Sequence, residues 1–337
     1  MTTASPSRGP ALRVAGVQVE SRNGEVEANL GRAGARVAQA AERGARLVLC
    51  PEFLAPGYIY DPSIWESAEP QDGPTERWLR ARAAAHGVYV GATYLEVDGD
   101  DFFNTFALAA PDGSVAGRVR KEALPGFEGW YFRSSPGSKV IDTDLGRIAV
   151  GICHDNHTAR FMRWLCREDV DLLLMPHSGP CIRALSLPLA GALMRDALQS
   201  IAPYYARTFG IPTVMVNKWS ATDSPSPIPI APFVTLRFRF PGLSTICDSD
   251  GAVLDHRADG EGIVLADVRL DPKRRRRPTE PTGYWARPPK HFARTWGALF
   301  RLLERWGTAA YARSEARKAA ARAAATRASG WRPACRA

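Results

Sequence analysis

Three residues of the sequence carry the groups that hydrolysis through a covalent intermediate requires. They are Glu52, Lys121 and Cys153, and each stands where a predicted strand ends. A thiol can attack an electrophilic carbon, a carboxylate can accept and return a proton, and an ammonium group can stabilise developing negative charge. The three residue types therefore predict nucleophilic acyl chemistry, provided that the fold brings these strand ends together.

Cys153 stands on a predicted turn from a strand into a helix. Such a turn projects the sulfur, and the N–H groups of the helix behind it can face a thiolate or an oxyanion. Gly151 allows the close backbone approach that this turn needs. Cys153, His154 and Asp155 do not form a triad, because the side chains of consecutive residues point apart. The base is therefore expected from another strand end.

The elements that must position these residues alternate along the chain. Apolar and β-branched runs predict strands, and helical spacing of apolar residues predicts helices. This alternation predicts an α/β protein with mixed sheets. The strands are 13–19, 47–49, 88–94, 104–109, 115–120, 147–152, 172–176 and 212–216, and the helices are 25–43, 75–86, 158–168 and 189–209.

Two further predictions concern the second half of the chain. Residues 220–241 are rich in Ser and Pro, so we expect a long loop there. Residues 242–247 and 262–268 read as a pair of strands around the turn 248–251.

An ordered series of short motifs makes the chain resemble the nitrilase, or carbon–nitrogen hydrolase, superfamily over approximately residues 12–271. One motif alone could arise by chance, whereas the whole series in this order makes coincidence improbable. The series includes Gln18, Asn29, Pro51-Glu52-Phe53, Gly57-Tyr58, Asn104-Thr105, Pro111-Asp112-Gly113, Arg120-Lys121, Gly151-Ile152-Cys153, Arg207, Asn217 and Asp250-Gly251.

The resemblance implies a four-layer α-β-β-α sandwich with two mixed β-sheets and a Glu-Lys-Cys mechanism. Glu52 would be the base and Cys153 the nucleophile, while Lys121 and the backbone N–H of His154 would stabilise the oxyanion. Glu128 matches the second glutamate of the family and would orient Lys121 or the substrate. The family uses no cofactor and no metal, and its members pair into homodimers or larger homo-oligomers.

Finer features favour an amide as the substrate. An Asp two residues after the nucleophile, here Asp155, is the pattern of amidases and carbamoylases. Residues 128–131 resemble the corresponding loop of aliphatic amidases. The alternatives are a nitrilase that converts a nitrile to an acid, an N-carbamoyl amide hydrolase, and a non-catalytic scaffold that keeps the fold. Residues expected to line the substrate pocket are Tyr58, Trp130, His154, Asn156, His157 and His177.

The histidines His154, His157 and His177 also invite a metal interpretation. Their spacing matches no known ligand pattern, so pocket-lining or structural roles are favoured. The motif after Pro176 and the segment after Asp155 depart from the family pattern, which leaves the substrate open.

Composition divides the chain into a catalytic part and a basic end. The net charge of +9 hides a balance of −5 over residues 1–272 and +14 over residues 273–337. We expect a frayed N-terminus at 1–11, a hydrolase domain at 12–271 and a basic C-terminal extension at 272–337. The extension could bind nucleic acid, but packing across the core or a neighbour is favoured because no nucleic-acid-binding motif surrounds it.

The sequence also bears on where the protein works. It has no apolar run long enough to cross a bilayer, and its six cysteines show no disulfide or zinc spacing. These features predict a cytoplasmic protein, and the family resemblance implies an enzyme with a small-molecule amide or nitrile substrate.

Overall fold

The computed structural model describes residues 11–183, 188–287 and 294–329. Within these ranges the chain forms two six-stranded mixed sheets, one three-stranded sheet and six α-helices. The predicted frayed segment 1–11 lies outside the described residues up to residue 10, and Ala11 begins the first strand.

The first sheet has the order β15-β1-β2-β3-β4-β5, and the second has the order β14-β13-β10-β8-β7-β6. Their strands are β1 (Ala11–Gln18), β2 (Leu47–Leu49), β3 (Tyr89–Asp98), β4 (Asp101–Ala109), β5 (Val115–Arg120), β6 (Val140–Thr143), β7 (Gly146–Val150), β8 (Leu172–His177), β10 (Thr213–Asn217), β13 (Ser244–Cys247), β14 (Val253–Arg257) and β15 (Gly262–Arg269). The small sheet has the order β11-β12-β9, from β9 (Cys181–Arg183), β11 (Ser224–Ile228) and β12 (Ala231–Arg239).

The helices are α1 (Val26–Glu42), α2 (Pro74–His86), α3 (Ala159–Leu165), α4 (Pro188–Phe209), α5 (Arg294–Arg313) and α6 (Glu315–Ser329). Short 3-10 helices are η1 (Pro62–Ser67), η2 (Glu128–Trp130), η3 (Cys153–His157) and η4 (Pro272–Arg274).

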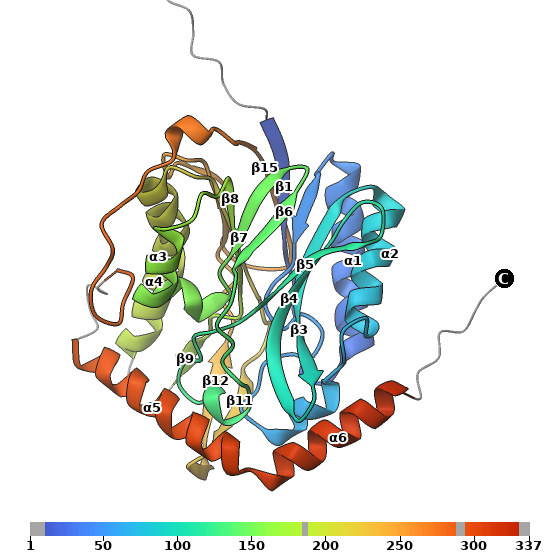
Figure 1. Cartoon of the computed structure of the whole chain (residues 1–337), viewed down its shortest axis with the longest axis vertical. Helices are drawn as coiled ribbons and strands as arrows, with labels where there is room; N and C mark the ends of the chain where they lie inside the picture. Colours follow the sequence, from blue (N-terminus) through green and yellow to red (C-terminus); the bar gives the residue numbers. More distant parts are fainter. Residues whose placement is uncertain (1–10, 184–187, 288–293, 330–337) are drawn as a thin grey trace, which may run out of the picture.

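The two large sheets lie face to face, with α1 and α2 outside one and α3 and α4 outside the other (Figure 1). Strand β2 shows how the sequence produces this layering. Leu47 and Leu49 pack between the sheets, whereas Val48 packs beneath α1 and α2. A strand buried on both faces must be apolar throughout, as this one is. The predicted α-β-β-α sandwich is confirmed.

Parallel pairing places candidate catalytic residues at the carboxyl ends of neighbouring strands in each sheet. Strands β1, β2 and β3 are parallel, and so are β7, β8 and β10. Their carboxyl ends therefore lie side by side. Glu52 follows β2, Cys153 follows β7, and His177 ends β8.

The structure corrects two of the sequence predictions. Residues 220–241 are not a loop, because β11 and β12 form an antiparallel pair there that continues onto β9. The turn 248–251 joins β13 to β14 rather than to residues 262–268. Those residues form β15, which pairs antiparallel with β1 in the other sheet.

The C-terminal segment packs against the sandwich. Helices α5 and α6 run along one end of the molecule and cross both halves (Figure 1). The largely buried Arg317 of α6 pairs with Asp101 at 2.9 Å. In the basic run before α5, Arg277 pairs with Asp169 at 3.0 Å and Arg275 pairs with Asp171. No helix among the described residues combines the length and the hydropathy that crossing a bilayer requires.

Candidate active site

Lys121 lies between two glutamates in the interior of the protein. Its Nζ donates to Glu52 Oε1 at 2.7 Å and to Glu128 Oε1 at 2.9 Å. The side chains of all three residues are fully buried. The fold therefore brings together three of the four predicted catalytic residues, from the ends of β2 and β5 and from η2.

Neighbouring groups fix the carboxylate of Glu52 in one orientation. Oε1 also accepts a hydrogen bond from Asn104 Nδ2 at 2.7 Å, and Oε2 accepts one from the Ser178 N–H at 2.9 Å. Ser178 Oγ donates to the Glu52 carbonyl at 2.6 Å. These contacts hold the carboxylate in place without the substrate.

Glu128 is held by the Tyr58 hydroxyl, which donates to Oε1 at 2.7 Å and lies 3.0 Å from the Tyr60 hydroxyl. Tyr58, which was predicted to line the substrate pocket, therefore contacts the candidate catalytic residue Glu128.

Cys153 begins η3 in a left-handed backbone conformation, with φ of 47°. A non-glycine residue there is strained, and such strain concentrates at functional sites. Gly151 is required nearby, because a Cβ at that position would lie 2.0 Å from Asn156 Oδ1. The predicted turn is thus present, but the strain at Cys153 was not foreseen.

Asp155 connects the turn of Cys153 to the segment that follows Lys121. Its Oδ1 accepts the Ala123 N–H at 2.7 Å, and its Oδ2 accepts the Ile152 N–H at 3.3 Å. The carboxylate is used on backbone groups, so it does not form a triad with His154. This agrees with the argument that consecutive side chains diverge.

The Cys153 thiol lies in the electrostatic field of the glutamates and the lysine. Burial raises the pKa of this thiol well above its ordinary value, Glu52 raises it further, and Lys121 opposes the rise. The thiol is therefore protonated at neutral pH. Its attack on a carbon must be coupled to proton removal by a base.

The charges of the other members follow from the same environment. Burial lowers the pKa of Lys121, but the attraction of Glu128 and Glu52 outweighs burial and places the pKa well above its ordinary value. Burial raises the pKa of Glu128 to about 7, against the opposing pull of Lys121. Lys121 is thus a permanent cation beside the thiol.

The three histidines form a row next to the nucleophile. The ring of His157 lies 6.0 Å from that of His154 and 5.8 Å from that of His177, between centroids. Burial lowers the pKa of His157 to about 4 and holds those of His154 and His177 well below the usual value. All three are neutral near pH 7. Within the described part of the chain, no three or more His, Cys, Asp or Glu side chains form a metal-site cluster.

Asn156 Nδ2 and His177 Nε2 make their contacts within the protein. Asn156 Nδ2 donates to the Gly151 carbonyl at 2.6 Å and lies 3.1 Å from His177 Nε2. This contact holds the nucleophile turn against the end of β8. Contact of these two residues, or of His157, with substrate stays a prediction.

Helix α5 of the C-terminal extension covers one side of the site. His154 Nε2 lies 2.8 Å from the Tyr284 hydroxyl, and the His154 ring stacks on Phe300 at 5.3 Å. A Cβ on Gly307 would lie only 2.6 Å from the Trp130 ring. The extension therefore supplies a wall that supports two predicted pocket residues, His154 and Trp130.

Three residues near the catalytic candidates were given no role from the sequence. Asn104 and Ser178 hold Glu52, and Lys218 lies fully buried behind them. Asn104 was recognised only as part of a motif. A signal for Lys218 existed, because it follows Asn217 at the end of β10, on the same sheet edge as His177.

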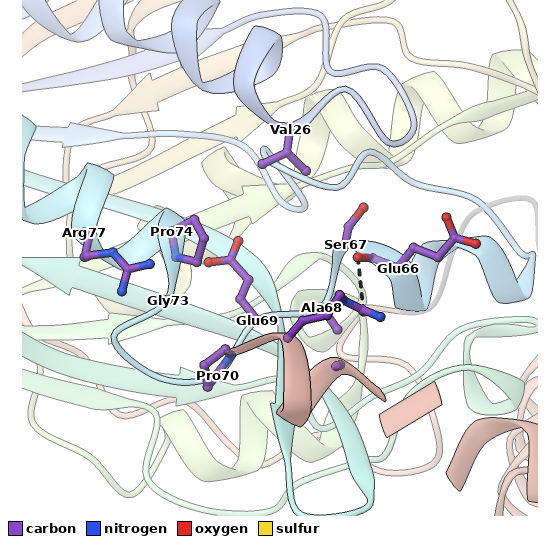
Figure 2. Close-up of a pocket in the computed structure, with 11 residues that line it drawn as sticks. Val26, Glu66, Ser67, Ala68, Glu69, Pro70, Gly73, Pro74 and Arg77 are labelled. Atoms are coloured by element: carbon purple, nitrogen blue, oxygen red, sulfur yellow. Dashed lines mark hydrogen bonds between the residues drawn. The ribbon is translucent and has the colours of Figure 1, made fainter. Parts of the chain in front are cut away.

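A separate pocket of about 210 Å³ lies between α6 and the segment from Glu66 to Arg77 (Figure 2). None of the predicted site residues lines it. Arg327 of α6 and Glu66 both line this pocket, and Arg327 Nη2 donates to the Glu66 carbonyl at 3.4 Å. Burial raises the pKa of Glu69, on the same wall, to about 7.

Comparison with known proteins identifies the family of this chain. A family model described as carbon-nitrogen hydrolase matches residues 13–277. The chain therefore belongs to the carbon–nitrogen hydrolase family. The resemblance inferred from the motif series is confirmed.

The sequence identity to individual relatives is low. Citrullinase of Francisella tularensis is 31% identical over 176 residues, which cover 49% of this chain and 60% of that protein. An omega-amidase of Danio rerio is 32% identical over 254 residues, which cover 72% of this chain and 83% of that protein. A carbon-nitrogen hydrolase structure from Helicobacter pylori has a TM-score of 0.69 at 19% identity, covering 79% of this chain and 91% of that one. The chain thus spans less than two thirds of the citrullinase.

Proposed function

We propose that the protein hydrolyses an amide-type carbon–nitrogen bond of a small molecule through a thioester on Cys153. The observation that supports this proposal is the buried cluster in which Lys121 bridges Glu52 and Glu128 beside the Cys153 thiol. The names of the two relatives, a citrullinase and an omega-amidase, support such a bond as the target. The same residues could serve a nitrilase, which stays the alternative.

The first half of the reaction forms the thioester. Glu52 accepts the thiol proton as Cys153 Sγ bonds to the carbonyl carbon. Lys121 Nζ and the His154 N–H stabilise the oxyanion, and no described residue accepts a hydrogen bond from that N–H. The carbon–nitrogen bond then breaks, and the leaving ammonia or amine takes the proton from Glu52.

The second half releases the acid. Glu52 takes a proton from water, whose oxygen attacks the thioester carbon. The carbon–sulfur bond breaks, and the proton returns to the Cys153 sulfur. Glu128 orients Lys121 in both halves, since it contacts the same ammonium group.

Intact mass after mixing the Glu52→Gln variant with amides, carbamoyl amino acids and nitriles tests this function. The variant lacks the base of both halves, so the thioester forms slowly and then has no base to activate water; after long incubation with excess substrate we expect an adduct whose added mass is that of the acyl group less one hydrogen. The adduct should disappear with Cys153→Ser and persist with Cys166→Ser, which changes the cysteine directly after α3. Full turnover by Cys153→Ser would remove the mechanism, and adducts from nitriles alone would favour the nitrilase.

We also propose that the enzyme is a cytoplasmic homodimer or larger homo-oligomer. Support for self-association comes from Leu299, Leu302 and Trp306 of α5, which are 41–53% exposed. No disulfide joins the cysteines of the described residues, which suits a reducing compartment. Light scattering of the purified protein tests the assembly.

A further inference from the structure

Lys218 is a fully buried lysine that no carboxylate contacts. Among the described residues its Nζ makes one hydrogen bond, to the Phe53 carbonyl at 3.2 Å, and it lies 5.2 Å from the centre of the Phe240 ring. An ammonium group has three donors. The ranges that the structure describes contain every Asp and Glu of the chain, and none of them lies in salt-bridge contact with Lys218.

The ammonium group nevertheless belongs to the active site. Phe53, whose carbonyl it contacts, directly follows Glu52. Lys218 also interacts electrostatically with both Glu52 and Cys153. Among the described residues, two of its three donors therefore have no hydrogen-bond partner.

The surroundings of Lys218 distinguish it from the other lysine of the site. Lys121 is neutralised by contacts with Glu52 and Glu128. Lys218 contacts a carbonyl and the aromatic face of Phe240. These groups offset the free-energy cost of burying the ammonium charge much less than a carboxylate would. Burial accordingly lowers the pKa of Lys218 to about 7. A ligand that brought its own negative charge would supply the missing partner.

We propose that Lys218 binds an anionic group of the substrate, so that the substrate is an amide that also carries a carboxylate. The inference rests on the proposed amide hydrolysis at Cys153. It names a specificity-determining residue, directly after β10, that the motif series does not contain. A neutral amide would leave the buried ammonium group without a partner.

The test compares two amides of equal length with the full-length enzyme. One is the monoamide of a short dicarboxylic acid, and the other ends in a methyl group instead of the carboxylate. In Lys218→Met the ratio of their kcat/KM values should fall by about 10- to 100-fold, mainly through KM of the anionic amide. Lys218→Arg should recover part of this ratio.

Lys139 offers a matched control, because it is also buried but donates to two carbonyls, those of Arg120 and Ser135. Lys139→Met should leave the ratio unchanged. If Lys218→Met lowers kcat for both amides equally, Lys218 acts on the transition state and the inference is overturned.

A second measurement needs no variant. Short dicarboxylates should inhibit the unaltered enzyme at least about tenfold more strongly than monocarboxylates of equal length. Equal inhibition would overturn the inference even if Lys218→Met failed to fold. Failure of the proposed function would look different, since neither amide would be turned over or acylate Glu52→Gln.

Discussion

Replacing Lys121 by methionine should expose how strongly the buried glutamates depend on their shared cation. Both carboxylates contact one nitrogen, at 2.7 and 2.9 Å, so their oxygens lie within about 6 Å of each other. At an effective dielectric constant of about 20, two charges at that distance repel by about 3 kcal/mol. Removing one partner of a buried ion pair typically costs about 3–5 kcal/mol. We expect the free energy of unfolding to fall by that amount at pH 8.

The loss should be smaller at pH 6. In the native protein the pKa of Glu128 is about 7, and Lys121 holds it down. Without Lys121 this pKa rises further, so Glu128 is protonated at pH 6 and the repulsion disappears. Urea unfolding followed by circular dichroism at both pH values measures the difference. Adding Glu128→Gln to Lys121→Met should restore most of the stability at pH 8.

The matched comparison is Lys139→Met, which leaves no pair of carboxylates behind. Its cost should be the same at both pH values. A loss below about 1 kcal/mol for Lys121→Met, or one that does not change between pH 6 and pH 8, would refute the electrostatic account.

Two other predictions concern the regions around the site. Burial raises the folded-state pKa of Glu69 from 4.5 to about 7, so the stability that the protonated side chain gives below pH 4.5 is lost as the pH rises through 7. Glu69→Gln should therefore flatten the fall in unfolding free energy between pH 5 and pH 8, by up to about 3 kcal/mol in urea titrations. An unchanged slope would contradict this. Gly307→Val should push α5 off Trp130, lower kcat/KM at least about tenfold and speed amide exchange in α5. Thr308→Val, on the exposed side of α5, is the control, and equal effects of the two variants would contradict it.

The strand ends were predictable from the sequence because buried parallel strands leave a strong signal. The run Leu47–Leu49 is apolar throughout, and the first charged residue after it is Glu52. The same reasoning placed Cys153 after β7, whereas Lys121 was placed at the end of a predicted hairpin, and β5 does pair antiparallel with β4. Parallel pairing within each sheet, which the alternation of strands and helices implied, sets the ends at which Glu52 and Cys153 lie.

The errors arose where local composition conflicts with tertiary pairing. Prolines at 225 and 227 suggested a loop, yet β11 is an edge strand, where a missing N–H can be tolerated. The predicted pairing of residues 242–247 with 262–268 was wrong because the true partner, β14, has exposed Val253 and Leu254 and no strong strand pattern.

Other features depend on tertiary contacts that residue spacing does not show. The positive φ of Cys153 follows from how Gly151 and Asn156 pack, which spacing cannot reveal. The burial of Lys218 likewise depends on Phe53 and Phe240, which are distant in sequence. Burial of this kind is decided by the assembled fold.

The wall that α5 builds also has a consequence for the chain during its synthesis. Helix α5 begins at Arg294, roughly 140 residues after Cys153. At about 5–20 residues per second, a ribosome needs on the order of ten seconds to cover that interval. Both large sheets can form before it ends, because their last strand stops at Arg269. For that time the nascent protein holds Cys153 without the cover over His154 and Trp130, so this wall is the last part of the site to be completed during biosynthesis.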